Sequence, residues 1–160
     1  MVLPEELEKA AFLRQFAPAH QQKLVGLARL KEYRADEVIF AEGERCPEVY
    51  VVLEGEVNLG IRVPGCGVID VHRVGPGGLL GWSPVLGGGP MTATAVSATR
   101  CRLAAFGADE VVALADRDPR FGLDFFHRLS AALAERLRAT RLQIPESARD
   151  KFRALREAAD

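Results

Sequence analysis

The alternation of apolar and polar side chains predicts strands in the middle part of the chain. From Glu56 to Val63 the alternation is strict, and Val57, Leu59 and Ile61 share one face with Val63. Successive side chains of a strand point to opposite sides of a sheet, so this segment is expected to have one buried and one wet face. A turn rich in Pro and Gly follows at 64–67, and Val68–Val74 is expected to be the return strand of a hairpin.

Further runs rich in Val, Tyr and Leu indicate other short strands. They are expected at Glu48–Leu53, Thr92–Val96 and Cys101–Phe106. Short strands separated by turn signals favour a sandwich or a barrel over a parallel sheet with crossover helices.

Helices are expected on both sides of these strands. Pro4–Phe16 and Pro18–Leu30 are predicted to be two short helices, because proline is tolerated in the first turn of a helix. Asp109–Ala115 is predicted to be a brief helix after the last strand.

A longer helix is predicted from Asp118 and Pro119, which supply an N-cap and a first-turn proline, to about Leu142. Apolar or half-polar residues recur along it at intervals of three and four, at Phe126, Leu133, Leu137, Thr140 and Ile144. This stripe is larger than one small barrel needs, so the Phe126–Ile144 helix is expected to form a homodimer. The alternative is that its distal half packs on the chain's own N-terminal helices.

The stretch Gly75–Val96 is unusually rich in glycine and contains three prolines. Glycine allows positive φ and lets another group approach backbone N–H donors closely. Such a loop can wrap an anionic ligand with main-chain amides. The alternative from composition alone is a solvent-exposed loop between two strands.

The order of residues in this stretch resembles the phosphate-binding cassette of cyclic nucleotide-binding domains, the family of the cyclic-AMP receptor. Gly81 matches the family glycine, and Thr92-Ala93-Thr94 matches the run that follows the family arginine. Two charged positions depart from the family. Trp82 stands where the family glutamate binds the ribose hydroxyl, and Met91 stands where the family arginine neutralises the cyclic phosphate.

The resemblance covers Phe12 to Arg141, most of the chain. The segment Glu37–Glu44 resembles a strand and tight turn near the start of the family domain, with Gly43 in the turn, and the phrase Tyr50–Val57 is close to the family's central strand pair. The resemblance implies a mainly β fold with flanking helices, namely a double-stranded β-helix jelly-roll barrel with N-terminal helices and a long C-terminal helix.

Two residues of the long helix also match the family pattern. Thr140 matches a threonine that touches the nucleotide base, and Arg136 matches an arginine that reaches the cassette glutamate. With Trp82 in place of that glutamate, Arg136 would lack its carboxylate partner and could meet a ligand anion instead.

Composition narrows the classes of function. The 160 residues carry a formal net charge of −1, which argues against a large basic surface for nucleic acid. No apolar run approaches the length of a membrane span and no signal peptide is evident, so a cytoplasmic protein without membrane contact is expected. We expect a sensor domain over residues 1–144 and a short charged tail over 145–160, which is too short for a helix-turn-helix domain, so no specific DNA binding by this chain is expected.

Catalytic and metal chemistry find little support in the sequence. Its three cysteines are far apart without a Cys-x-x-Cys pair, and its three histidines are scattered without a His-x-His pair. No nucleophile with a neighbouring base is evident, so no enzyme and no metal site are expected. His72, on a predicted strand, is interpreted as a structural or surface residue.

Together these observations favour a non-catalytic, ligand-sensing regulatory module that signals through its long helix, with a protein partner as its output. Recognition of cyclic AMP and cyclic GMP is expected to be weakened, with another anionic small molecule as a possible ligand and no other cofactor. The alternative is a degenerate, ligand-free module for dimerisation or protein interaction. The expected ligand-binding residues are Gly81, Trp82, Ser83, Met91, Thr92, Ala93, Arg136 and Thr140.

Overall fold

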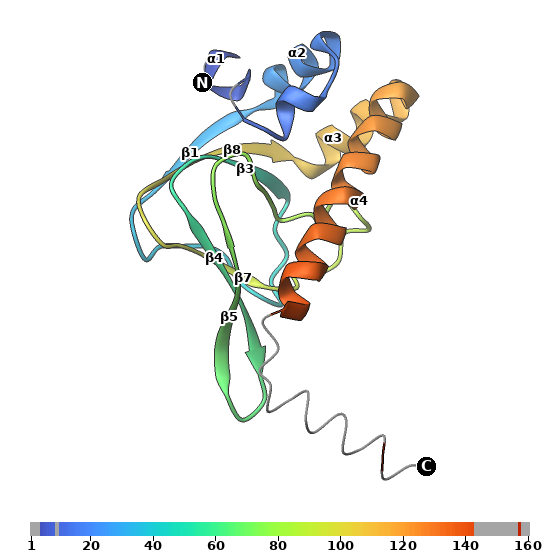
Figure 1. The fold of residues 1–160 in the computed structure, drawn as a ribbon. Coiled ribbons are helices and arrows are strands. Elements are labelled where there is room, and N and C mark those ends of the chain that lie inside the picture. The colour runs from blue at the N-terminus through green and yellow to red at the C-terminus, as the bar shows by residue number, and fades with distance from the viewer. Residues whose placement is uncertain (1–3, 9, 143–156, 158–160) are drawn as a thin grey trace.

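The computed structural model describes residues 4–8, 10–142 and 157, and it shows two four-stranded antiparallel sheets with helices packed beside them (Figure 1). One sheet has the strand order β1-β8-β3-β6 and the other has the order β2-β7-β4-β5. The first sheet consists of β1 (Arg29–Tyr33), β8 (Cys101–Gly107), β3 (Glu48–Glu54) and β6 (Leu79–Leu80). The second sheet consists of β2 (Val38–Phe40), β7 (Thr94–Ser97), β4 (Val57–Val63) and β5 (Gly67–Val74).

The first sheet is the middle layer of the molecule, because β3 is buried on both faces. Tyr50 and Val52 belong to a core cluster between the two sheets, together with Phe40, Val57, Leu59, Val74, Leu80, Met91, Ala95, Cys101, Leu103 and Ala105. Val49 and Val51, which alternate with them, belong to a second cluster shared with the helices. This alternation explains why Glu48–Leu53 is a nearly continuous apolar run, as is typical of a strand covered on both sides.

The helices are α1 (Pro4–Glu8), α2 (Pro18–Leu27), α3 (Ala108–Arg117) and α4 (Pro119–Leu142), with a 3-10 turn at Leu13–Gln15. Phenylalanine rings join the first half of α4 to the N-terminal segment. The rings of Phe16 and Phe121 stack with centroids 6.0 Å apart, and Phe12 meets Phe125 edge-on at 6.2 Å. These contacts position the start of α4, so that its second half runs beside β5 (Figure 1).

The mainly β fold with flanking helices and a long C-terminal helix is confirmed, with two corrections at the N-terminus. The expected helix Pro4–Phe16 is instead the short helix α1 and the 3-10 turn, and the helix from Pro18 ends at Leu27 rather than Leu30. Arg29 and Leu30 belong to β1, because their backbone pairs with Ala105 and Ala104 of β8. The strands form two sheets, and no closed barrel of hydrogen-bonded strands is present among the described residues. Ile144 and the expected tail, apart from Glu157, lie outside the described residues.

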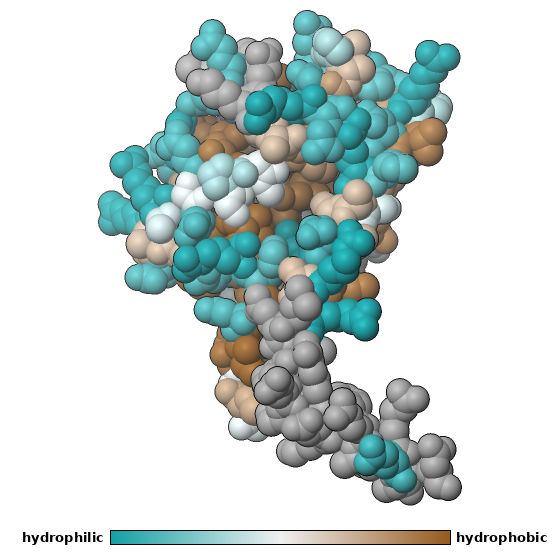
Figure 2. Space-filling model, viewed as in Figure 1, coloured by the Kyte–Doolittle hydropathy of each residue, from teal (hydrophilic) through white to brown (hydrophobic). Residues whose placement is uncertain are grey.

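The β4–β5 hairpin extends beyond the body of the sheets and carries apolar surface at its end (Figures 1 and 2). Val68 and Ile69, on β5, are exposed there. Along the part of the chain that the structure describes, no helix combines the length and the apolarity that crossing a membrane requires.

Asp118 caps the start of α4, as the sequence predicts. Its Oδ1 accepts a hydrogen bond from the backbone N–H of Phe121 at 3.2 Å, and its Oδ2 accepts one from Nζ of Lys23 in α2 at 2.7 Å. The hydrogen bond from Lys23 and then that from Phe121 lower the pKa of Asp118 to about 2. Asp118 therefore ties α2 to the first turn of α4.

The substitution Asp118→Asn tests this connection through its pH dependence. A carboxyl pKa that is lower in the folded than in the unfolded state stabilises the fold above the unfolded pKa of about 4, and this stability is lost as pH falls toward 2. The difference in midpoint of urea unfolding between wild type and Asp118→Asn should therefore shrink from pH 5 to pH 2. Asp116→Asn, at an exposed position of α3, is the control. A difference for Asp118→Asn that stays constant over this range would contradict the assignment.

Candidate functional site

A cavity of about 280 Å³ lies between the second half of α4 and the β4–β5 hairpin. Its walls are mainly apolar, and most of its lining comes from strands and a helix that the core holds in place. The lining residues are Leu59, Ile61, Val71, His72, Trp82, Thr92, Ala93, Leu133, Arg136, Leu137 and Thr140. A largely apolar hollow with a few polar groups is the usual form of a small-molecule site, although this one is at the small end of the range.

A second, much smaller hollow of about 20 Å³ adjoins this cavity at the glycine-rich loop. It is lined by Phe40, Leu59, Gly81, Trp82, Ser83, Met91, Thr92, Ala93 and Arg136. This volume holds about one water molecule. The two hollows share Leu59, Trp82, Thr92, Ala93 and Arg136, so they are two parts of one site. The structure thus brings together all eight residues that the sequence predicts, and we call the site the cassette cavity.

The backbone at Gly81 needs glycine in two respects. Gly81 follows β6 directly and has φ +73°, in the left-handed region that residues with a Cβ rarely adopt. A Cβ at this position would also lie 3.1 Å from Cε of Met91 and 3.2 Å from the carbonyl oxygen of Glu48. Gly81 therefore lets the chain turn closely around the narrow end of the cassette cavity.

Met91 fills the narrow end with an apolar side chain. Its N–H donates to the carbonyl of Glu44 at 2.8 Å, and its own carbonyl accepts from the N–H of Gly43 at 2.8 Å. The residue is 3% exposed and belongs to the core between the sheets. Met91 is thus fixed by its backbone at the narrow end, and it offers no charge or hydrogen-bond donor from its side chain.

Trp82 and Arg136 close the narrow end from the other side. The guanidinium carbon of Arg136 lies 4.3 Å from the centroid of the Trp82 ring, which is within the range of a cation–π contact. Nη2 of Arg136 donates to the backbone carbonyl of Leu79. The Trp82 ring therefore lies at the narrow end of the cavity and covers the guanidinium.

The Arg136 guanidinium lacks the acceptors that a buried cation normally has. Its Nε and Nη1 are buried and have no hydrogen-bond partner in the described part of the chain, and no carboxylate there forms an ion pair with it. Burial alone lowers the pKa of Arg136 to about 10, so the side chain remains charged at neutral pH. A buried cation without a counter-charge costs free energy, which an anion in the cavity would recover.

Thr140 and His72 are two of the other polar side chains that line the wider part. The Thr140 hydroxyl donates to the carbonyl of Arg136 at 2.8 Å, so its side chain is held against its own helix. Burial, and then the nearby charge of Arg136, lower the pKa of His72. His72 is thus neutral at pH 7, and it is paired with Leu59 across the hairpin.

Sequence reasoning missed the apolar half of the cavity and the position of His72. The signal was present in the hairpin itself, where Leu59 and Ile61 share the face that the strict alternation predicts to be buried. What the alternation does not give is the helix that covers this face, at Leu133 and Leu137.

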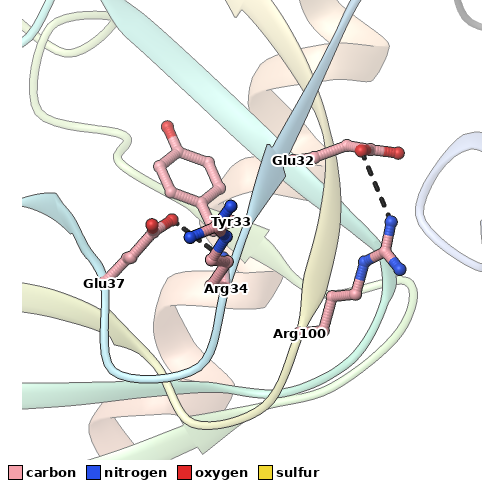
Figure 3. Close-up of a pocket in the computed structure, with 5 residues that line it drawn as sticks. All are labelled: Glu32, Tyr33, Arg34, Glu37 and Arg100. Atoms are coloured by element: carbon pink, nitrogen blue, oxygen red, sulfur yellow. Dashed lines mark hydrogen bonds and ion pairs between the residues drawn. The ribbon is translucent and has the colours of Figure 1, made fainter.

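A wider polar hollow of about 650 Å³ lies elsewhere, lined by Glu32, Tyr33, Arg34, Glu37 and Arg100 (Figure 3). It contains both signs of charge, with one ion pair and one carboxylate bound to the backbone. Arg100 Nη2 lies 3.6 Å from Glu32 Oε2, and Glu37 Oε2 accepts from the N–H of Arg34 at 2.8 Å. Two carboxylates and two guanidinium groups on exposed side chains give no clear selectivity for one charge. The cassette cavity is therefore the better candidate site.

Groups of three or more His, Cys, Asp or Glu side chains that could hold a metal ion are not found among the described residues.

Comparison with known proteins identifies the fold and its relatives. The family model of the cyclic nucleotide-binding domain matches residues 30–118, more than half of the chain. The CRP-like cAMP-activated global transcriptional regulator of Mycobacterium tuberculosis is 26% identical over 139 residues, which are 86% of this chain and 60% of the regulator. This chain therefore spans about 60% of the length of the curated relatives that it matches.

Two solved structures have the same arrangement of elements. A cyclic nucleotide-binding domain from Methylobacillus flagellatus KT superposes with a TM-score of 0.80 at 22% identity, over 88% of this chain and 82% of that one. The catabolite activator protein of Thermus thermophilus gives a TM-score of 0.69 at 28% identity, over 82% of this chain and 60% of that one. The family match ends before α4, so it does not include Arg136 or Thr140.

Proposed function

This chain belongs to the cyclic nucleotide-binding domain family, and we propose that it is a ligand-sensing regulatory module whose recognition of cyclic nucleotides is weakened. The proposal rests on the side chains that line the narrow end of the cassette cavity and on the small space that they leave. Met91 and Trp82, which the resemblance matches to the two family charges, line this end, and the remaining space holds about one water molecule. A cyclic phosphate would find neither its arginine nor the room that it needs there.

Ligand binding in this cavity has a direct route to a response. The helix α4 contributes four residues to the cavity lining, namely Leu133, Arg136, Leu137 and Thr140. A ligand in the cavity would therefore contact α4 directly. A change in the contacts of Arg136 with Trp82 and with the carbonyl of Leu79 would alter how the second half of α4 is held. We therefore propose α4 as the output element, acting on a second copy or on a protein partner.

The outer face of α4 supports the proposal of a homodimer. Leu123 and Leu137 are 76% and 65% exposed, and they are two heptads apart with the exposed Ser130 midway between them. Phe126 and Leu133, which the sequence also suggests for the dimer, pack instead against the chain's own core. Two exposed leucines on the same side of α4 give a second helix apolar surface to cover.

Weak binding of cyclic AMP and cyclic GMP by the native protein is the direct test of the proposed function. We expect dissociation constants in the high micromolar range or weaker, measured by titration calorimetry at physiological salt. The reason is the loss of two hydrogen-bonded charge contacts, which contribute about 1.5–3 kcal/mol each. Tight binding of either nucleotide would contradict the proposal, and it would mean that the cassette is misaligned or that Arg136 supplies the missing charge.

A second candidate function is a ligand-free interaction module. The contact of Arg136 with Trp82 favours it, since the protein's own side chains fill most of the narrow end. Mass spectrometry of the small molecules released when the purified protein is denatured separates the two candidates. A stoichiometric small molecule supports the sensor, whereas the interaction module predicts none.

A further inference from the structure

We propose that the wider part of the cassette cavity takes a small, largely apolar carboxylic acid, whose carboxylate pairs with Arg136. The inference rests on the proposed function, because it assumes that this cavity binds a ligand. It goes further by naming the chemical class of that ligand.

The charge requirement comes from Arg136. Nε and Nη1 of its guanidinium are buried without an acceptor among the described residues, while Nη2 is held by the carbonyl of Leu79. A neutral ligand would cover this cation and leave it unpaired, which is costly in an apolar site. A carboxylate would supply acceptor atoms and the missing negative charge together. His72 is neutral at pH 7, so among the described residues that line the cavity Arg136 alone is charged, and a singly charged ligand matches it.

The shape requirement comes from the two parts of the cavity. The narrow end holds about one water molecule, so a phosphate group cannot enter it without displacing Met91 or Trp82. The wider part, of about 280 Å³, is open to a ligand, and Arg136 borders both parts. The charged group of the ligand must therefore be compact and must lie beside Arg136 in the wider part. A planar carboxylate satisfies both conditions better than a tetrahedral phosphate.

The apolar walls of the cavity determine the chemical character of the uncharged part of the ligand. Leu59, Ile61 and Val71 come from the hairpin, and Leu133 and Leu137 face them from α4. These five side chains offer dispersion contacts and no hydrogen bonds, so they favour an aromatic or branched aliphatic body over a sugar. A ribose placed against these five side chains would receive no hydrogen bond from them.

The chain's single tryptophan provides the assay, because Trp82 lies in the wall of the cavity and against Arg136. Phenylacetate is the probe, and its neutral amide, phenylacetamide, has nearly the same shape without the charge. Binding of both is measured by Trp82 fluorescence and by titration calorimetry at pH 7.5. We expect phenylacetate to bind about 10- to 100-fold more tightly than phenylacetamide, as is typical for a hydrogen-bonded charge pair.

Variants of Arg136 show whether the preference for the acid comes from this residue. In Arg136→Gln the two probes should bind equally, whereas Arg136→Lys keeps the charge and should retain part of the preference. Circular dichroism and thermal unfolding establish that each variant is folded. If Arg136→Gln does not fold, Arg136→Lys and the acid–amide comparison in wild type still decide the question.

The outcomes separate this inference from the proposed function. Equal binding of acid and amide by the wild type, or a preference that persists in Arg136→Gln, would overturn the carboxylate inference and leave a ligand-binding cavity in place. Binding of neither probe, together with a stoichiometric small molecule of another class released on denaturation, would overturn the inference alone. Binding of neither probe and no released molecule would overturn both.

Discussion

The double variant Trp82→Glu with Met91→Arg is expected to bind cyclic AMP two to four orders of magnitude more tightly than the native protein. The glutamate would accept from the ribose hydroxyl and the arginine would pair with the cyclic phosphate, as the family resemblance implies. Each charged hydrogen bond contributes about 1.5–3 kcal/mol. Two of them give about 3–6 kcal/mol, and a factor of ten in affinity corresponds to about 1.4 kcal/mol.

The structure gives both substitutions a suitable environment. The Trp82 ring lies 4.3 Å from the Arg136 guanidinium, so a shorter glutamate at this position could form the ion pair that Arg136 now lacks. Replacement of the indole ring by the smaller glutamate side chain would also enlarge the narrow end beyond the space of one water molecule. The backbone of residue 91 is held by the turn at Gly43 and Glu44, so an arginine there would start from the same position as Met91.

A control separates the added charges from the added space. The variant Trp82→Gln with Met91→Gln removes the same bulky side chains but adds no charge, and it should bind cyclic AMP as weakly as the wild type. Titration calorimetry on all three proteins makes the comparison, with unfolding curves to establish that each is folded. If the folded Glu/Arg variant binds no better than the Gln/Gln control, the narrow end is not built for a cyclic phosphate and the cassette is misaligned.

The sequence predicts most of the β fold because its strands alternate regularly or are covered on both sides. The hairpin at Val57–Val63 and Gly67–Val74 and the start of α4 at Asp118 follow from local patterns. The strands β1 and β6 do not. Arg29–Tyr33 is largely polar and half-exposed, and β6 is only two residues long. Both are strands because they pair with β8 and β3, which is a long-range property that no local pattern contains.

The residues of the candidate site could also be predicted from the sequence, but the contacts between their side chains could not. The resemblance places Gly81, Met91 and Arg136 in one site, and the structure brings them together. The missing hydrogen-bond partners of the Arg136 guanidinium could not be predicted from the sequence. They depend on which acceptors lie around Arg136 once the chain is folded. The resemblance predicts Trp82 at the position of the family glutamate, whereas only the packed structure shows the indole ring lying against the charge.

The substitution Leu137→Asp is expected to convert the proposed homodimer into a monomer. Leu137 is 65% exposed in the single chain, and it belongs to the exposed stripe of α4 with Leu123 and Ser130. In a symmetric dimer the substitution buries two carboxylates close to each other without partners. The cost is at least about 3 kcal/mol, so the association constant should fall by about 100-fold or more.

The choice of position follows from the burial along α4. An aspartate at Leu133 would disturb the core of a single chain, because Leu133 packs against the buried cluster and lines the cassette cavity. Loss of the dimer in that variant could then reflect unfolding. Leu137 also borders the cavity, so Leu123→Asp, at a residue that is 76% exposed and outside the cavity lining, provides the independent second variant.

Light scattering and sedimentation at tens of micromolar measure the result, with Val38→Asp as the control. Val38 is 58% exposed and lies on β2, at the edge of its sheet opposite to β5, which packs beside α4. This control should remain a dimer, while Leu137→Asp and Leu123→Asp should both sediment as folded monomers. A wild-type protein that is already monomeric, or two α4 variants that remain dimeric, would show that the outer face of α4 does not pair with a second copy. In that case the exposed stripe would have to serve a different protein partner.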